Sequence, residues 1–144
     1  MSGTILLGID GSEGGARALD FVKQWTQSCS GRIVVAYVIE WSPYSFNTPQ
    51  ENAERHRRRE EELEQAQASV LEPVVAQLKA AGFEATGVIQ HGHAAKTLVR
   101  IADEEQAHMI VVGRRGQSAM KTMLFGSVAS TLVQLANVPV TVVP

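Results

Sequence analysis

Short apolar runs and helix-like patterns alternate along this chain. Five of the runs are apolar on both faces and rich in β-branched residues, which is typical of strands buried inside a parallel sheet. The third run is the weakest, because Gly87 interrupts it. The expected strands are residues 4–9, 32–39, 83–90, 108–113 and 138–143.

Between these runs, apolar residues recur at the three- and four-residue spacing of amphipathic helices. In the longest such segment, Pro73 should kink the helix or split it in two, and Gly82 should end it. The expected helices are residues 13–29, a segment of about thirty residues from Glu51, residues 94–105, and a last helix from Ser127.

The alternation of strand and helix predicts a single α/β domain over residues 1–144, a parallel five-stranded sheet with helices on both faces. This doubly wound, three-layer architecture suits a chain of 144 residues, which is long enough to bury a sizeable core. The order of the strands does not follow from the pattern alone.

Composition and charge narrow the class of protein. With 44% hydrophobic and 19% charged residues the chain is an ordinary globular protein, and its formal charge of −2 favours no broad nucleic-acid contact. Three arginines at 57–59 suggest such a contact, but six glutamates and four arginines between 51 and 64 nearly cancel, which favours a solvated helix face.

The single cysteine, Cys29, excludes an intrachain disulfide and suits a reducing cytosol. No run has the length of a secretory signal or a membrane span, so we expect a cytoplasmic protein with no membrane segment.

The connection after the fourth expected strand is unusually long. Such connections usually take about 2–6 residues, whereas residues 114–125 make twelve, bracketed by Gly113 and Gly126-Ser127. Glycines let backbone N–H groups approach a ligand, and Ser127 stands where a helix N-cap belongs. The pattern indicates a phosphate site at the positive end of a helix; the alternative is a turn glycine and a plain helix start. Neither the P-loop nor the dinucleotide-binding glycine fingerprint occurs.

Gly113-Arg114-Arg115-Gly116, followed by nine residues and Gly126-Ser127, resembles the ATP-binding motif of the universal stress protein family. "ILLGIDGSEGGARAL" is similar to the opening strand and helix of that family, "VVAYVIE" to its second strand and "VPVTVV" to its last. The resemblance covers essentially the whole chain. It implies the strand order 3-2-1-4-5, which would bring Asp10 and Gly113 to one crevice, where open α/β sheets bind ligands.

The resemblance also implies a set of nucleotide contacts. The main chain of Val38 would bind the adenine edge, and Asp10 would reach the ribose, the phosphates or a bound Mg²⁺. Asp10 could instead cap the first helix, and Arg114 and Arg115 could be ordinary surface charges. The family often has Gly-x-Pro after the third strand; here the sequence is Gly92-His93-Ala94, which should loosen the start of the next helix. The full set of implied nucleotide-binding residues is Gly8, Ile9, Asp10, Val38, Gly113, Arg115, Gly116, Gln117, Gly126, Ser127 and Val128.

The function implied is that of a regulatory protein that binds ATP, ADP or AMP and hydrolyses it slowly at most, so that it is not expected to be an enzyme. From Gly113 to Ser127 there is no Asp, Glu or His to serve as a general base, and Asp10 is the only acid expected nearby. The resemblance further implies a homodimer through residues 138–143, with a tetramer left open. The alternatives are a protein-interaction module that needs no nucleotide and a genuine ATPase. An oligomer that docks on a transporter or kinase and reports adenylate levels is compatible with the main interpretation, and residues 51–64 would be its candidate partner surface.

Overall fold

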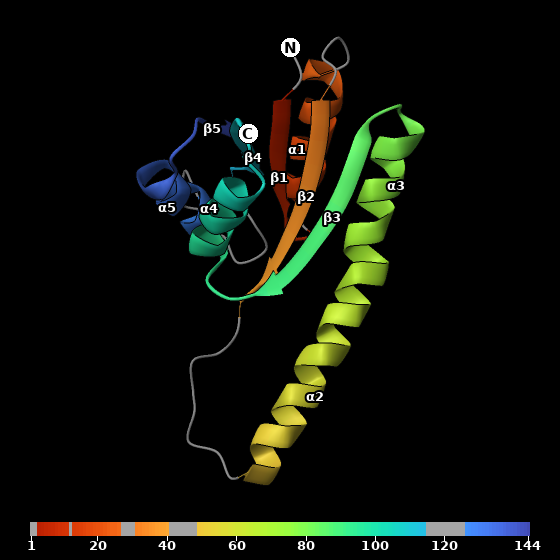
Figure 1. The fold of residues 1–144 in the computed structure, drawn as a ribbon, viewed down its shortest axis with the longest axis vertical. Helices are drawn as coiled ribbons and strands as arrows, with labels where there is room; N and C mark the ends of the chain where they lie inside the picture. Colours follow the sequence, from red (N-terminus) through yellow and green to blue (C-terminus); the bar gives the residue numbers. More distant parts are fainter. Residues whose placement is uncertain (1–2, 12, 27–30, 41–48, 115–125) are drawn as a thin grey trace.

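The computed structural model describes residues 3–11, 13–26, 31–40, 49–114 and 126–144. Five parallel strands form one sheet in the order β3-β2-β1-β4-β5 (Figure 1). The expected fold class is therefore confirmed, together with the strand order that the family resemblance implied. The strands are β1 (Gly3–Ile9), β2 (Gly31–Ile39), β3 (Glu84–His91), β4 (Met109–Gly113) and β5 (Val140–Val143).

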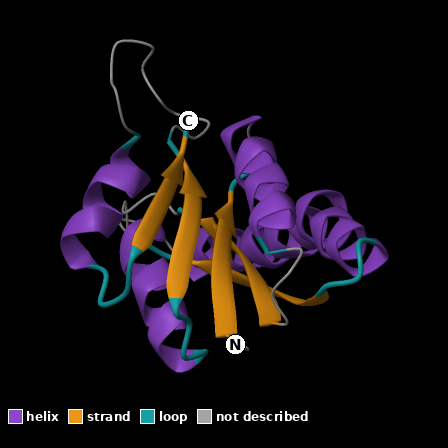
Figure 2. Ribbon diagram, turned by 90° about the horizontal axis from the view of Figure 1, so that it is seen from above, coloured by secondary structure: helices purple, strands orange, loops and turns teal. Residues whose placement is uncertain are grey.

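Helices cover both faces of this sheet (Figure 2). One face packs against α1 and α3, and the other packs against α4 and α5. In the part of the chain that the structure describes, no helix is long and apolar enough to cross a membrane. The helices are α1 (Glu13–Trp25), α2 (Pro49–Ala66), α3 (Glu72–Ala80), α4 (Ala94–Glu104) and α5 (Ser127–Leu135), with a π-helical turn, η1 (Gln67–Leu71), between α2 and α3.

Two apolar cores lie on the two sides of the sheet, because successive side chains of a strand point to opposite faces. Leu6 of β1 belongs to the core beneath α4 and α5, and its neighbour Leu7 belongs to the core beneath α1 and α3. Both are fully buried. Burying a side chain of this size contributes about 1.5–3 kcal/mol to the free energy of folding, so the central strand β1 stabilises both cores.

A π turn interrupts the long helical segment just before Pro73, where the sequence predicted a kink or a split, and the backbone stays helical on both sides of it. Proline has no N–H to donate to the preceding turn, and here the chain forms the π turn η1 just before it, in which the N–H of Glu72 bonds to the carbonyl of Gln67. At the other end of α3, Gly82 adopts φ +92°, and the N–H of Phe83 reaches back to the carbonyl of Leu78. This left-handed glycine ends the helix as expected.

Gly87 does not disrupt β3, which pairs with β2 along its whole length. A Cβ at Gly87 would lie 2.9 Å from Cδ2 of Leu71, so the glycine makes room for the side chain of η1. Several boundaries also differ from expectation, most of them by one or two residues, and α1 ends at Trp25 rather than at 29. His91 ends β3 rather than lying in a loop, and β5 begins at Val140 rather than at 138, because Pro139 has no N–H for the ladder and joins only through its carbonyl, which accepts from Ile110.

Candidate functional site

The carboxyl ends of β1 and β4 lie side by side at the point where the strand order reverses. Leu7 pairs with Val111, while on the other side of β1 Ile9 pairs with Tyr37 of β2. Asp10, which follows β1, is half-buried, and Gly113 is the last residue of β4. The two residues therefore lie at the same edge of the sheet, where ligands bind in open α/β folds.

Gly113 has a packing role that the sequence did not reveal. A Cβ at this position would lie 2.6 Å from both the carbonyl carbon and the oxygen of Gly14 in the first turn of α1. Gly8 is similarly confined, because a Cβ there would lie 3.0 Å from Cγ1 of Val112 and 3.2 Å from Cδ1 of Leu98. Gly113 thus allows the backbone of α1 to approach β4 closely, and Gly8 leaves room for the side chains of Val112 and Leu98.

The two ends of the long connection after β4 meet at this edge. The N–H of Gly126 donates to the carbonyl of Arg114 at 2.7 Å, and the N–H of Arg114 donates to Val143 at the end of β5, also at 2.7 Å. Of the implied phosphate contacts, Arg115, Gly116 and Gln117 lie outside the described residues. Arg114 and Gly126, which bracket this connection in the sequence, therefore lie side by side at the edge of the sheet.

The start of α5 differs by one residue from the sequence prediction, which placed Ser127 as the N-cap. Gly126 is the N-cap, with φ −69° and ψ 164°, and its carbonyl accepts the first helical bond from Ser130. Ser127 is instead the first helical residue and is exposed, while Val128 is half-buried against the core. Because Gly126 has no side chain, no side-chain hydrogen bond caps this end of the helix.

The guanidinium group of Arg114 has a buried nitrogen near this edge. Among the described residues, Nε of Arg114 has no hydrogen-bond acceptor. A buried N–H that lacks an acceptor is costly, so an oxygen atom supplied by a bound anion would stabilise it.

The main chain of Val38 lies just past the end of β1. Beyond Ile9, strand β2 continues to pair with β3 alone, and the carbonyl of Ile39 accepts from the N–H of Gly92 at 3.0 Å. The N–H and C=O groups of successive residues point to alternate sides of a strand. Those of Val38 therefore point toward the side of β1, the side on which the nucleotide crevice is predicted.

A group of titratable side chains borders the same edge, and sequence reasoning did not identify it. Burial raises the pKa of Tyr37, and the negative charges of Asp10 and of Glu62 in α2 raise it further. Glu62 in turn lies 3.6 Å from Nε2 of His91, a side chain only 10% exposed. Tyr37 is one residue from Val38, but nothing in the sequence indicated that α2 would bring a carboxylate to it.

The start of α4 is held by two side chains where the family often has a proline. Nδ1 of His93, the N-cap, accepts from the N–H of Lys96 at 3.3 Å, and Glu40 accepts from the N–H of Ala94 at 3.3 Å. A proline at position 94 could not make the second bond. Gly92, at φ +150°, lies beside Thr97, whose Oγ1 would be 2.8 Å from an added Cβ.

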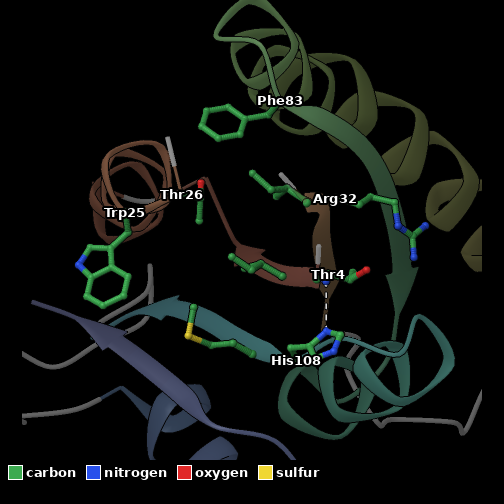
Figure 3. Close-up of a pocket in the computed structure, with 11 residues that line it drawn as sticks. Thr4, Trp25, Thr26, Arg32, Phe83 and His108 are labelled. Atoms are coloured by element: carbon green, nitrogen blue, oxygen red, sulfur yellow. Dashed lines mark hydrogen bonds between the residues drawn. The ribbon is translucent and has the colours of Figure 1, made fainter. Parts of the chain in front are cut away.

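The opposite edge of the sheet, at the amino ends of the strands, holds a mainly apolar cavity of about 230 Å³ (Figure 3). Trp25 and Phe83 contribute aromatic rings to its lining, and the N–H of Thr4 donates to Nδ1 of His108 at 3.3 Å. This cavity contains none of the residues predicted to bind nucleotide, so the two ends of the sheet differ in chemistry.

Comparison with known proteins identifies relatives along the whole chain. The model of the universal stress protein family matches residues 1–144. The universal stress protein of the QAH/OAS sulfhydrylase 3′ region of Thermus aquaticus is 30% identical over 141 residues, which cover 97% of both chains. Universal stress protein Rv1996 of Mycobacterium tuberculosis is also 30% identical over 97% of this chain, but this chain spans only 47% of that protein's length.

Solved structures share the fold. MJ0577, a protein of Methanocaldococcus jannaschii, superposes with a TM-score of 0.82 at 26% identity, covering 97% of this chain and 94% of the other. A universal stress protein in complex with cAMP gives 0.68 at 25% identity, covering 98% and 95%. A family member from Arabidopsis thaliana with AMP bound gives 0.66, covering 98% and 90%; at 15% identity this likeness shows the fold alone. Because the family model matches residues 1–144, the chain belongs to the universal stress protein family.

Proposed function

We propose that this protein binds an adenine nucleotide, ATP or its ADP and AMP counterparts, in the crevice between the carboxyl ends of β1 and β4. The observation that carries this proposal is the arrangement around Arg114. Its buried Nε lacks an acceptor among the described residues, and its carbonyl is bonded to Gly126, the N-cap of α5. A phosphate here would face the positive end of a helix and a buried guanidinium at once.

The adenine and ribose would lie over the ends of β1 and β2. The main-chain N–H and C=O of Val38 would bind the adenine edge, with Gly8 and Ile9 forming the wall of the crevice. Asp10 is half-buried at the end of β1, where its carboxylate would reach the ribose hydroxyls or one coordination position of Mg²⁺. Mg²⁺ usually takes its other ligands from phosphate oxygens and water.

The phosphates would extend toward α5. The backbone N–H groups of Gly126 to Val128 and the hydroxyl of Ser127 would hold the outer phosphates, and Gly113, Arg115, Gly116 and Gln117 would surround the inner ones. The family match and the neighbour in complex with cAMP support binding of an adenine nucleotide.

We propose that the bound nucleotide acts as a signal or structural ligand and is hydrolysed slowly at most. Efficient hydrolysis needs a base or a water-orienting group beside the γ-phosphate, and residues 113–127 contain no Asp, Glu or His. Asp10 is the only acidic residue among those predicted to bind the nucleotide. Glu62, which lies near the same edge of the sheet, already contacts Nε2 of His91. A turnover above about one per second, the range of ordinary enzymes, would overturn this part and establish a genuine ATPase.

Regulation implies partners, and we propose a cytoplasmic homodimer formed through residues 138–143. Strand β5 is an edge strand that pairs only with β4, and an apolar edge tends to pair with another chain. The Val133 and Leu135 side chains of the neighbouring helix α5 are exposed, at 58% and 43%. Sedimentation of the wild type beside a Val142→Pro variant tests this interface, because the carbonyl of Val143 faces β4 and the N–H of Val142 therefore points toward the open edge.

Calorimetric titration with Mg·ATP, ADP, AMP and cAMP tests nucleotide binding directly. The sharpest variant is Ser127→Asp, because a carboxylate in the first turn stabilises the helix yet repels a phosphate at the same place. We expect affinity to fall at least about tenfold, since hydrogen bonds to charged groups contribute about 1.5–3 kcal/mol. Gln50→Glu, an equal charge change in the first turn of α2, is the matched control and should bind as the wild type does.

If the wild type gives no heat with any of the four nucleotides, and releases none on denaturation, the proposal is wrong. A nucleotide-independent interaction module would then be the better description of the protein.

A further inference from the structure

The helix α2 projects away from the body of the protein. Figure 1 shows it extending past the carboxyl ends of β2 and β3, far from α1 and α5. Most of its described side chains from 50 to 65 are exposed; the half-buried exceptions, Arg55, Arg59 and Leu63, follow one another at four-residue spacing and mark a single side. A helix that is polar nearly all round and stands clear of a core is typical of a solvated arm or of one that meets another charged surface.

The projecting part of α2, residues 50–65, is called the arm below. Its charges are arranged antisymmetrically. Residues 55–64 read Arg-His-Arg-Arg-Arg-Glu-Glu-Glu-Leu-Glu. Counting outward from the bond between residues 59 and 60, every arginine on one side is matched by a glutamate at the same distance on the other. A basic block, residues 55–59, is thus followed by an acidic block, residues 60–64, of equal length.

The exposed side of the arm displays both blocks. It lies opposite the half-buried residues and carries Arg57 and Arg58, followed by Glu61 and Glu64. Nη2 of Arg58 lies 4.0 Å from a carboxylate oxygen of Glu54, at the limit of an ion pair. Within the described part of the chain, Arg57, Glu61 and Glu64 form no ion pair.

We propose that α2 pairs antiparallel with α2 of a second copy of this chain, across a twofold axis near residues 59 and 60. In this arrangement the basic block of each copy lies against the acidic block of the other, so that Arg57 and Arg58 of one copy face Glu61 and Glu64 of the other. A twofold contact requires a surface that is complementary to itself, and an antisymmetric charge pattern provides that property. A parallel pair would instead set arginine against arginine.

Other occupants match only half of the arm. A nucleic acid or an anionic surface would be attracted by residues 55–59 and repelled by residues 60–64, and a basic partner would meet the reverse. The second copy is the one occupant whose charges are fixed by the same sequence. Because the arm flanks β3 and the edge strand β5 lies at the other end of the sheet, this contact leaves β5 free to form its own.

The contact should be weak and sensitive to salt. Exposed ion pairs each contribute little, and the Debye length shrinks from about 30 Å at 0.01 M salt to about 3 Å at 1 M. We expect one step of self-association, measured by sedimentation velocity, to weaken at least about tenfold between about 0.02 M and 0.5 M NaCl. If β5 also pairs, this step joins dimers; otherwise it joins monomers.

Two charge-reversed variants and their mixture test the geometry. Arg57→Glu/Arg58→Glu makes the arm acidic, and Glu61→Arg/Glu64→Arg makes it basic; neither set includes Glu62, which contacts His91. Each variant alone should lose the salt-sensitive step through like-charge repulsion. A mixture of the two, with one of them fluorescently labelled at its amino terminus, should form the mixed pair, because each arm then meets its opposite.

The fourfold variant carrying all four changes should self-associate again. Circular dichroism on each variant separates loss of the contact from loss of the helix, since intrahelical pairs also change. Persistence of the salt-sensitive step in either single-block variant would overturn the proposal. So would a mixture of two helical variants that associates no better than either one alone.

Discussion

Replacing Gly113 by alanine tests whether this glycine is required by packing, independently of any ligand. The alanine Cβ would lie 2.6 Å from two backbone atoms of Gly14 and 2.9 Å from its Cα. These atoms belong to the first turn of α1, not to the end of a flexible side chain. The clash can be relieved only by moving the helix or the strand.

The size of the effect follows from that geometry. Ordinary contact begins near 3.4 Å, so α1 and β4 would have to separate by about 0.8 Å at this point. Overpacking of a well-packed interior costs about 1–3 kcal/mol, and the rigidity of the backbone atoms places this case in the upper part of that range. We expect the free energy of unfolding to fall by about 2–3 kcal/mol and Tm by roughly 4–10 °C.

Urea unfolding of nucleotide-free protein, followed by tryptophan fluorescence, measures this change without a contribution from ligand binding. Gly15→Ala is the matched control, because a Cβ there meets nothing closer than 3.6 Å and alanine favours the helix. It should be neutral or stabilising by up to about 1 kcal/mol. A Gly113→Ala protein within about 0.5 kcal/mol of the wild type would refute the reasoning.

Three further substitutions probe other parts of the fold. Leu78→Ala removes a fully buried side chain and should lower the free energy of unfolding by about 2–5 kcal/mol in the same urea assay. Ala94→Pro loses the bond to Glu40 but places proline at the first helical position after an extended residue, so we expect Tm to change little or rise by a few degrees. Alkaline absorbance titration should show the pKa of Tyr37 above its ordinary value of 10.0, with Asp10→Asn lowering it. Because the folded-state pKa is raised, this group's contribution to stability is complete below about pH 10 and is lost as the pH rises through the folded-state pKa.

The arrangement of strands and helices could be predicted because it depends on local patterns. Apolar runs and helical spacing located the strands and helices that the structure describes, although α1 ends at Trp25 rather than at 29, and the family resemblance supplied the strand order. The differences arise where a single residue decides a boundary. Pro139 keeps the start of the last strand out of the ladder, and Gly126 takes the N-cap that the sequence assigned to Ser127.

Contacts between distant segments could not be predicted in the same way. The room that Gly87 gives to Leu71 depends on the π turn lying over β3, and the approach of Glu62 to Tyr37 depends on the direction of α2. Neither pair is close in sequence, and no local periodicity encodes it. The structure places the ends of β1 and β4 and the start of α5 at one edge of the sheet, as the implied nucleotide site requires. The contacts between individual residues and a nucleotide stay predictions.

The close approach of Gly113 to Gly14 changes how the glycine motif can be tested. A glycine demanded by helix–strand packing would be needed in this fold even if no phosphate ever bound beside it. Loss of nucleotide binding in a Gly113 variant would therefore be explained equally well by displacement of α1 and by loss of a phosphate contact. Ser127 separates the two explanations, because its side chain is exposed and an aspartate there favours the helix while opposing an anion. A Ser127→Asp protein that is as stable as the wild type but does not bind nucleotide would assign the role to the phosphate, and one that binds normally would show that the glycine motif serves the fold alone.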